Sequence, residues 1–407
     1  MAKSASQFVI RRAMAADMPT LFKLSKMVHF INLPPDQEII SDKIRNSRQS
    51  FLRAARNAKT VHKPKPDTSS AAGGISEKTA LADIFMFVIE ELNTEGCIGT
   101  SQVVSQMGGP GHPNVCFKLE TRDKYAEDLK FGARHTVARV HLDETGPSEL
   151  GGLIMQPSFR GHRMKLGRFV ALVRFHFIGL HRGLFRPKIL AEMMAPITAK
   201  GESLVWDALG RRFIPLSYDE ADRFCQYSRG FMVDLLPKGD IHLSLLPPQA
   251  RAHIGEVGPD TLPARRMLER LGFEYNGFVD PFDGGPYLTA NTDEIDIVRN
   301  TFSATLGTTI KYEQTNNAGI VSVLNNDGDF RAVQCAFQID RTGKIRLTSD
   351  SMMSLHAEAG MIAGCTPMRV PIEPGRQPAN GKKRAAKKPT AKPTTKKKTT
   401  KRNSAKG

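Results

Sequence analysis

The stretch of sequence that most constrains the fold runs from Ser148 to Met194, where two apolar runs enclose a basic loop and an apolar segment. The first run ends before Pro157 and predicts a buried strand, and Arg168–His181 carries enough apolar residues to predict a mostly buried helix. The second run, Lys188–Met194, predicts another strand. Because a helical crossover of this length allows the two strands to pair in parallel, we expect an α/β fold.

The loop between the first strand and the helix, Gln156–Gly167, is rich in Arg, Lys, His and Gly. It lies at a helix N-terminus, where free N–H groups and the positive end of the helix dipole attract an anion. The loop lacks the Gly-Lys-Ser/Thr ending of a nucleotide P-loop and the full Gly-x-Gly-x-x-Gly fingerprint, so the pyrophosphate of coenzyme A fits better. The alternative is a basic surface loop that only caps a core helix. The candidate cofactor-binding residues here are Arg160, Gly161, Lys165, Leu166, Gly167 and Arg168.

The remaining chain before residue 300 predicts further helices and strands around this unit. In order, these are the strand Phe8–Arg12, a helix from Ala16 through Met27, the helix Asp36–Phe51, the strand Ala82–Glu90, a turn at Asn93–Gly96 and the returning strand Cys97–Met107. Further on, Glu202–Phe213 and Ala264–Phe273 each predict a helix that ends near a glycine and is followed by a strand. Together these elements predict a mixed central sheet with helices around it.

From about Asn300 the pattern changes to short alternating runs separated by Gly or by Asn-Asp-Gly, which is typical of a small β domain. The runs are Ile310–Tyr312, Ile320–Val323, Arg331–Cys335 and Lys344–Leu347. We therefore expect a main α/β region over residues 1–300, a small β domain over 301–373 and a tail over 374–407. Within the main region, about residues 58–78 offer little to bury and predict a disordered insert.

The net charge of +17 lies mainly in the C-terminal tail. Residues 376–407 hold 13 Lys or Arg and no acidic residue, which leaves 17 − 13 = +4 for the rest of the chain. This composition predicts a disordered, solvated tail that solubilises the protein or binds nucleic acid weakly and non-specifically, and the alternative is a specific role on DNA. No apolar run approaches membrane-spanning length and the N-terminus lacks a signal-peptide core, so we expect a cytoplasmic protein with no membrane partner. The 5 cysteines are scattered singly, which argues against a disulfide scaffold and against a metal site.

Several ordered blocks of the sequence resemble the arginine N-succinyltransferase family, whose members include subunits that also act on ornithine. The most specific block is Ile254–Arg265, which runs on through Leu271-Gly272-Phe273 to Asp280–Pro286. Supporting blocks are Ser148–Leu150 with Leu153, Ala191–Met193, Trp206–Phe213 and Leu235–Lys238. The resemblance implies a GNAT-like acyltransferase fold and transfer of the succinyl group of succinyl-CoA to the α-amine of arginine, in arginine catabolism. It also implies contact between Leu153 and succinyl-CoA, and an enzyme of several subunits.

The sequence departs from the family at a residue with a proposed catalytic role. The resemblance places the family's proton-donating His in a Val-His-Pro segment, which here reads Val257-Gly258-Pro259, and glycine has no proton to donate. Candidate acid or base residues are then Glu192, at the end of the second parallel strand, and His253, near the replaced position. For each of them the alternative is a structural or surface role. A water chain, or a substrate amine that is already neutral, is a further alternative.

The guanidinium of an arginine substrate favours a planar carboxylate partner. The acidic residues in the matching blocks, and hence the candidate substrate-binding residues, are Glu192, Asp280 and Asp283. For Asp283 the alternative is to cap its own turn. The succinyl carboxylate needs a cation, for which Arg160 or Lys165 is a candidate, although both also suit the phosphates of CoA. Two other functions stay open: an acyltransferase of the same fold with another acyl-CoA or amine, and a non-catalytic CoA-binding protein.

Overall fold

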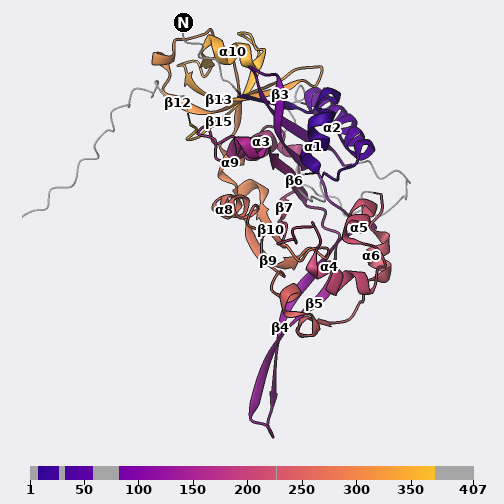
Figure 1. Ribbon diagram of the computed structural model, residues 1–407. Helices are drawn as coiled ribbons and strands as arrows, with labels where there is room; N and C mark the ends of the chain where they lie inside the picture. The colour runs from indigo at the N-terminus through magenta and orange to yellow at the C-terminus, as the bar shows by residue number, and fades with distance from the viewer. Residues whose placement is uncertain (1–7, 27–32, 58–81, 226, 372–407) are drawn as a thin grey trace, which may run out of the picture.

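The computed structural model describes residues 8–26, 33–57, 82–225 and 227–371. Its strands join into one sheet, in the order β11-β15-β12-β13-β1-β2-β3-β6-β7-β10-β9-β4-β5-β8, with β14 paired to β13 (Figure 1). The strands are β1 Phe8–Arg12, β2 Ile84–Glu91, β3 Gly96–Val104, β4 Asn114–Ala126, β5 Phe131–Asp143, β6 Ser148–Met155, β7 Lys188–Glu192, β8 Ile241–His242, β9 Glu274–Val279, β10 Pro286–Asn291, β11 Phe302–Thr305, β12 Asn317–Leu324, β13 Phe330–Ile339, β14 Ile345–Leu347 and β15 Ile362–Pro367. Strands β6 and β7 pair in parallel, and the other ladders of the described residues are antiparallel. The predicted mixed α/β fold is therefore confirmed.

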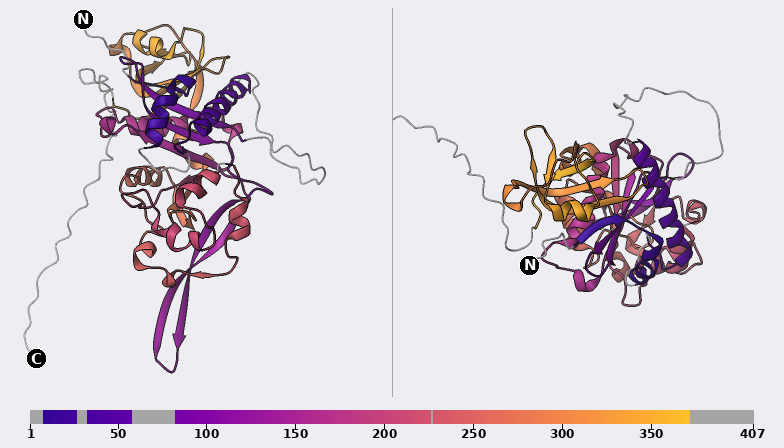
Figure 2. Two further views of the ribbon diagram at one scale, coloured as in Figure 1. Left: turned by 45° about the vertical axis from the view of Figure 1, so that its right-hand side comes forward. Right: turned by 90° about the horizontal axis from the view of Figure 1, so that it is seen from above.

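Helices cover both faces of the sheet (Figure 2). They are α1 Met18–Ser25, α2 Gln37–Asn57, α3 Leu166–Leu180, α4 Leu204–Ala208, α5 Tyr218–Cys225, α6 Gly230–Leu235, α7 Pro248–Arg251, α8 Leu262–Arg270, α9 Asp296–Arg299 and α10 Ser349–Leu355. Helix α1 packs against Met86 and Val88 of β2, whereas α3 packs against Phe85 and Phe87 of the same strand. Because successive residues of a strand point to opposite faces, α1 and α3 enclose the sheet between them. None of the described helices is long and apolar enough to span a membrane.

Helix α2 occupies the place that a strand would take beside the first half of β2, because β1 covers only the second half. The side chains of Ser47 and Ser50 accept hydrogen bonds from the N–H groups of Met86, at 2.8 Å, and Ile84, at 3.2 Å. These bonds satisfy backbone donors that the sheet leaves open. Helix α2 therefore spans the sheet edge, and its Phe51 reaches the same core as α3.

The strand, helix, strand unit predicted from the sequence is present as β6, α3 and β7, and its parallel pairing is confirmed. The parallel ladder joins only Ser148–Leu150 to Ile189–Ala191. Strand β6 then continues to Met155 beside β3, without β7. The sheet therefore opens between β6 and β7 toward the carboxyl ends of both strands, where open α/β sheets bind ligands.

Most of the other predicted elements are confirmed. They are the strands at β1, β2, β3, β12, β13 and β14 and the helices at α1, α2 and α8. The strands of residues 301–373 join the main sheet through the pairing of β13 with β1, so the domain boundary near residue 300 stays a prediction. The predicted disordered insert and the predicted tail both lie outside the described residues.

One predicted helix is shorter than expected, and two predicted strands are wrong. The helix Glu202–Phe213 is shorter, since α4 ends at Ala208 and a 3-10 turn follows, where Gly210 lies against the Trp206 ring so closely that a Cβ would come within 2.3 Å. The strand predicted after it is instead helix α5, with buried residues spaced for a helix. The strand Ile310–Tyr312 is absent; Ile310 bonds to the Leu347 carbonyl and the chain then enters a 3-10 turn.

Strands β4 and β5 form a long hairpin whose far end extends beyond the rest of the molecule (Figure 1). Near its base the hairpin is held on both sides, by Phe117–Lys118 pairing with β9 and by Val137–Ala138 pairing with β8. At the far end, Leu129 and Phe131 are 73% and 63% exposed. An extended two-stranded hairpin gains little stability from its own contacts. The exposed apolar side chains at this end are therefore available to bind another surface.

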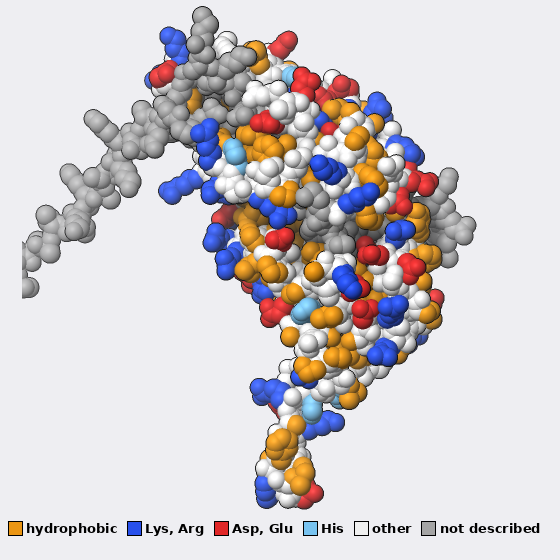
Figure 3. Space-filling model, viewed as in Figure 1, with side chains coloured by type: hydrophobic (Ala, Val, Ile, Leu, Met, Phe, Trp, Pro, Cys, Tyr) orange, Lys and Arg blue, Asp and Glu red, His pale blue; other side chains and the backbone are white. Residues whose placement is uncertain are grey.

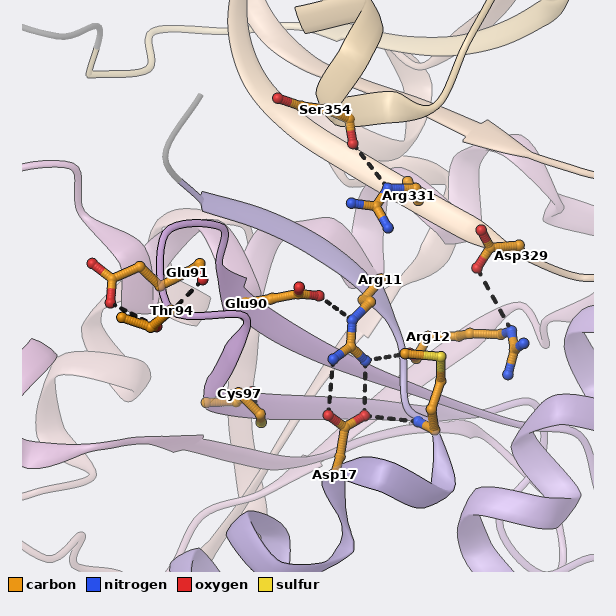
Figure 4. A network of polar contacts seen from close by, with 12 residues as sticks. Arg11, Arg12, Asp17, Glu90, Glu91, Thr94, Cys97, Asp329, Arg331 and Ser354 are labelled. Atoms are coloured by element: carbon orange, nitrogen blue, oxygen red, sulfur yellow. Dashed lines mark hydrogen bonds and ion pairs between the residues drawn. The ribbon is translucent and has the colours of Figure 1, made fainter. Parts of the chain in front are cut away.

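A buried ion network fastens β1 to α1 and β2 (Figure 4). The guanidinium of Arg11 donates to both carboxylate oxygens of Asp17, at 2.8 and 2.9 Å, and its Nε donates to Glu90. Asp17 also accepts from the N–H of Met14 at 2.8 Å. Arg11, Asp17 and Glu90 are all buried, so water does not hydrate their charges. The ion pairs and hydrogen bonds among them take the place of hydration.

We expect the substitution Asp17→Ala to lower the free energy of unfolding by about 3–5 kcal/mol, because it leaves a buried guanidinium short of a counter-charge and a backbone donor without an acceptor. Urea unfolding followed by circular dichroism measures the change. The control is Asp42→Ala, which breaks an exposed pair with Arg45 and should cost less than about 0.5 kcal/mol. Equal losses in the two variants would show that the buried network contributes nothing special.

Candidate active site

Strand β6 is irregular where the sheet opens. Its register against β3 shifts between Thr100 and Gln102, which marks a β-bulge. Gly152 in the bulge has a φ of 57°, a left-handed conformation that favours glycine. The next residue, Leu153, is half-buried. A bulge re-aims the backbone and side chains that follow it, so Leu153 lies at an altered stretch of strand beside the opening.

The basic loop leads from β6 into α3. Helix α3 begins after Lys165, which has a φ of 52° and gives no side-chain cap, so the N–H groups of the first turn have no capping side chain. Arg163, Lys165 and Arg168 are exposed, and open space surrounds the point where Gly161 would carry a Cβ. An uncapped helix start among cations favours a bound anion. The loop residues predicted to bind the cofactor thus lie together around one helix start.

An ion pair joins this loop to the segment that follows α7. The Nη1 of Arg160 lies 3.3 Å from the Oδ2 of Asp260, on the exposed surface. Two residues before Asp260, the N–H of Gly258 donates to the carbonyl of Met194 at 2.9 Å. A Cβ on Gly258 would lie 3.2 Å from the carbonyl oxygen of Ala195. Gly258, where the sequence resemblance implies a histidine, therefore borders the chain just beyond β7.

The turn at residues 280–285 packs against the same segment after β7. Asp283 accepts hydrogen bonds from the N–H of Ala195 at 2.9 Å and from the N–H of Gly285 at 2.7 Å. A Cβ on Gly285 would lie 1.8 Å from the carbonyl oxygen of Met193, so only glycine allows this approach. Burial raises the pKa of Asp283 to about 6 in spite of these bonds.

Asp280 braces the turn from inside. Its Oδ1 accepts from the N–H of Phe282 at 2.7 Å, and its Oδ2 accepts from the hydroxyl of Tyr287 at 3.2 Å. Burial and the nearby Asp283 raise the pKa of Asp280 well above its ordinary value. Asp280 and Asp283 thus hold the turn in place, and their oxygens are already occupied by backbone and tyrosine donors.

Glu192, at the end of β7, belongs to a separate polar group. Its Oε1 accepts from the side-chain amide of Asn114 at 3.4 Å, and the Oδ1 of Asn114 accepts from the guanidinium of Arg229. Burial lowers the pKa of Arg229, but the charge of Glu192 and other nearby groups outweighs burial and raises it overall. Asn114 therefore bridges a carboxylate and a cation across the start of β4.

Lys43 and Asp222 extend this group from α2 and α5. Burial lowers the pKa of Lys43 to about 8, although the charges of Glu149 and Asp222 act to raise it. Burial raises the pKa of Asp222 to about 7, although Lys43 and Arg229 act to lower it. The Oδ1 of Asp222 is buried without a hydrogen-bond partner among the described residues. Both groups therefore change charge close to neutral pH.

We call these five charged residues, Lys43, Glu149, Glu192, Asp222 and Arg229, the charged cluster. It holds three carboxylates and two cations. Sequence reasoning found only Glu192, because the members come from separate elements that meet only in the folded protein. Isolated Lys, Asp and Arg residues in amphipathic segments carry no local signal of such a meeting.

His253 lies in the chain between α7 and Gly258. Its Nδ1 is buried and has no hydrogen-bond partner among the described residues. Two residues later, the N–H of Gly255 donates to the carbonyl of Gly284 at 2.8 Å, which holds this segment against the 280–285 turn. The structure therefore gathers the His253 to Gly258 segment, the turn and the end of β7 into one packed region.

A mixed α/β sheet that opens beside a bulged strand, with an uncapped helix start among cations at the opening, is the arrangement expected of an acyltransferase. The family model described as arginine N-succinyltransferase beta subunit matches residues 8–297. Arginine N-succinyltransferase of Yersinia pestis (strain Pestoides F) is 33% identical over 284 residues, which cover 68% of this chain and 79% of the relative. That of Yersinia enterocolitica is 36% identical over 217 residues, covering 53% of this chain and 62% of the relative.

A solved structure agrees with these matches. Arginine/ornithine succinyltransferase subunit AI from Pseudomonas aeruginosa aligns with a TM-score of 0.68 and 25% identity, covering 89% of this chain and 99% of that one. The chain belongs to the arginine N-succinyltransferase family, which is a family of acyltransferase enzymes.

We expect Asp222→Asn to stabilise the protein at pH 8 by roughly 2–4 kcal/mol and to have little effect near pH 4. The pKa of Asp222 is raised to about 7 in the folded state, so its contribution favours folding at low pH and is lost as pH rises toward 7. Asparagine imitates the protonated carboxyl and removes this loss. Urea unfolding at several pH values measures the difference.

The matched control for this prediction is Asp219→Asn on the same helix, where the carboxylate is exposed. It should change the free energy of unfolding by less than about 0.5 kcal/mol. A destabilised Asp222→Asn variant at pH 8 would contradict the expectation and show that the charged form of Asp222 is well solvated by its neighbours.

Proposed function

We propose that this protein transfers the succinyl group of succinyl-CoA to the α-amine of L-arginine. The observation that carries the proposal is that β6 leads into an uncapped helix start among cations, whereas β7 ends at Glu192, a carboxylate of the charged cluster. The cluster as a whole holds three carboxylates and two cations. This arrangement suits an anionic cofactor on one side and a cationic amine on the other.

The cofactor half is the start of α3 with the loop before it. The N–H groups of Leu166, Gly167 and Arg168 belong to the uncapped first turn and would hold the pyrophosphate of CoA. Arg160, Gly161 and Lys165 would surround it. The bulged strand at Leu153 would place backbone N–H groups near the thioester carbonyl, where they stabilise the oxyanion as it forms.

The amine half is the charged cluster. The cluster holds three carboxylates and two cations, so a guanidinium would supply a third cation to it. Asp222 is the member with an unsatisfied buried oxygen. We therefore assign the guanidinium to Asp222, rather than to Asp280 and Asp283, whose oxygens already accept other hydrogen bonds.

In the reaction, the lone pair of the α-amine attacks the thioester carbonyl carbon. The C–N bond forms, the C–S bond breaks, a carboxylate takes the amine proton, and the CoA thiolate leaves and is reprotonated. Glu192 is the candidate base, because it ends the strand at the opening. His253, with its buried and unpartnered Nδ1, is the candidate proton donor in place of the absent histidine at Gly258.

The first test measures release of free thiol from succinyl-CoA and acetyl-CoA with arginine, ornithine and other amines. We expect thiol release that depends on arginine and succinyl-CoA, at equal rates for the full chain and for a chain without residues 376–407. Glu192→Gln should lower kcat by about 10²- to 10⁴-fold, the usual effect of losing an acid–base group. The matched control is Glu274→Gln, an exposed carboxylate on β9, which should keep the full rate.

The same assay separates the alternatives. Turnover of another thioester or amine in place of this pair would establish an acyltransferase of different specificity. Binding of CoA without turnover of any thioester would establish a CoA-binding protein. In that second case Gly258→His, which returns the family's residue to its position, should create turnover if the histidine is all that is missing.

We also propose that two copies of this chain pair through the β4–β5 hairpin. The neighbour in Pseudomonas aeruginosa is named a subunit. Figure 3 shows apolar side chains at the far end of the hairpin, and a second exposed apolar set, Phe224, Tyr227 and Leu235, lies on and between α5 and α6 on the same half of the molecule. Arg134 of the hairpin forms an ion pair with Asp123 within the same chain. The exposed apolar side chains are therefore the groups that we expect to contact a second copy. Reciprocal contact of these two surfaces gives a closed two-fold dimer.

We expect the full chain to sediment as a dimer, and the double variant Leu129→Asn with Phe131→Asn to sediment as a monomer. The matched control is Lys130→Asn, between those residues, where the φ of 48° suits asparagine; it should stay dimeric. A monomeric wild-type chain, or a double variant that remains dimeric, would overturn the hairpin pairing.

A further inference from the structure

Arg174 is a buried cation that the site described so far does not use. It lies on α3, is 3% exposed, and donates from Nε to the carbonyl of Ala171 at 3.0 Å and from Nη1 to the carbonyl of Gly151 at 3.4 Å. No acidic side chain of the described residues forms an ion pair with it. Burial lowers its pKa to about 9. Burying a guanidinium without a counter-charge lowers the stability of the fold. A bound anion from outside the chain would offset this loss.

The position of Arg174 along β6 is well defined. Helix α3 runs against the direction of β6, because Gly167 lies beside Met155 whereas Arg174 lies beside Gly151. A Cβ added to Gly167 would lie 3.7 Å from the Cγ of Met155. Gly151 is the first residue of β6 beyond the three-residue ladder with β7. Arg174 therefore stands at the closed end of the opening, and the uncapped helix start stands at its wide end.

This spacing matches a dicarboxylic acyl group. A thioester carbonyl held near Leu153 lies two residues from Gly151, and the bulge at Gly152 keeps this separation below the roughly 6.6 Å of a fully extended strand. The carboxylate of a succinyl group sits two methylene groups beyond its thioester carbonyl, in the direction that leads from the wide end to the closed end. The guanidinium of Arg174 has N–H donors beyond the two in use, enough for a bidentate contact with a carboxylate.

The two cations considered from the sequence fit this role less well. Arg160 is exposed and paired with Asp260, and Lys165 is exposed at the start of α3. Both lie at the wide end, where the phosphates of CoA are expected. A cation that reads the far end of the acyl group needs to be buried and unpaired, because discrimination against a neutral acyl group depends on leaving a buried charge unsatisfied.

We propose that Arg174 binds the distal carboxylate of the acyl group and so selects a dicarboxylic thioester over a neutral one of equal length. The inference rests on the proposed function, since it assigns the acyl specificity of the same site. The contact between Arg174 and the distal carboxylate sets which acyl group binds and takes no part in the transfer step itself. A neutral four-carbon acyl group would leave the guanidinium buried without an anion.

The test compares succinyl-CoA with butyryl-CoA, which has the same chain length and no carboxylate, in the full chain with arginine as acceptor. Arg174→Met keeps a long apolar side chain and should lower kcat/KM for succinyl-CoA by about 100-fold, while kcat/KM for butyryl-CoA changes by less than about 3-fold. Arg174→Lys should retain part of the preference, since lysine keeps the charge without the bidentate geometry. The control Arg299→Met, on the neighbouring helix α9, should leave both values unchanged.

Equal losses with both thioesters in a folded Arg174→Met protein would overturn the proposal and make Arg174 a packing residue. If Arg174→Met does not fold, Arg174→Lys decides by the same ratio. If the wild-type chain transfers no acyl group to any amine, calorimetry of thioester binding replaces the rate. Tighter binding of succinyl-CoA than of butyryl-CoA, lost in the variant, then supports the role of Arg174 although the proposed reaction has failed, and equal affinities overturn it.

Discussion

The site depends on the shortness of one ladder. Strands β6 and β7 pair in parallel through three residues each, and the backbone of β6 then continues with a neighbour on one side only. The bulge at Gly152, the helix that starts at Leu166 and the end of β7 at Glu192 all lie along the chain beyond the point where that pairing stops. A longer ladder would close the sheet and leave neither the cofactor loop nor the charged cluster a common space to face.

Much of this arrangement could be predicted from the sequence, because it depends on short stretches of neighbouring residues. Apolar runs of the right length predicted β6, α3 and β7, and the Arg, Lys and Gly of the intervening loop predicted an anion at the helix start. The extent of α4 was not legible, because it depends on how closely Gly210 packs on Trp206. The charged cluster was not legible either, since Lys43, Asp222 and Arg229 meet only through tertiary packing.

The acidic residues show how one residue type takes two roles. Asp280 and Asp283 were candidates because they are acidic residues in the blocks that resemble the family, and in the structure their oxygens accept hydrogen bonds from N–H groups of their own turn and of Ala195. Asp222 stood in an unremarkable amphipathic helix, yet its buried oxygen has no partner among the described residues. Turn chemistry leaves a signal in sequence, whereas an unsatisfied carboxylate leaves none.

The sheet order also sets a timetable for synthesis. Strand β1 lies between β2 and β13. Because β1 is synthesised first and β13 late, one edge of β1 stays unpaired until β13 has been made. Phe51 stacks on Phe330 of β13, with ring centroids 5.8 Å apart, so it also lacks this contact until β13 has been made. Until the ribosome has passed β13, a growing chain presents an open strand edge and an uncovered aromatic surface, and such nascent chains depend on chaperones to stay apart.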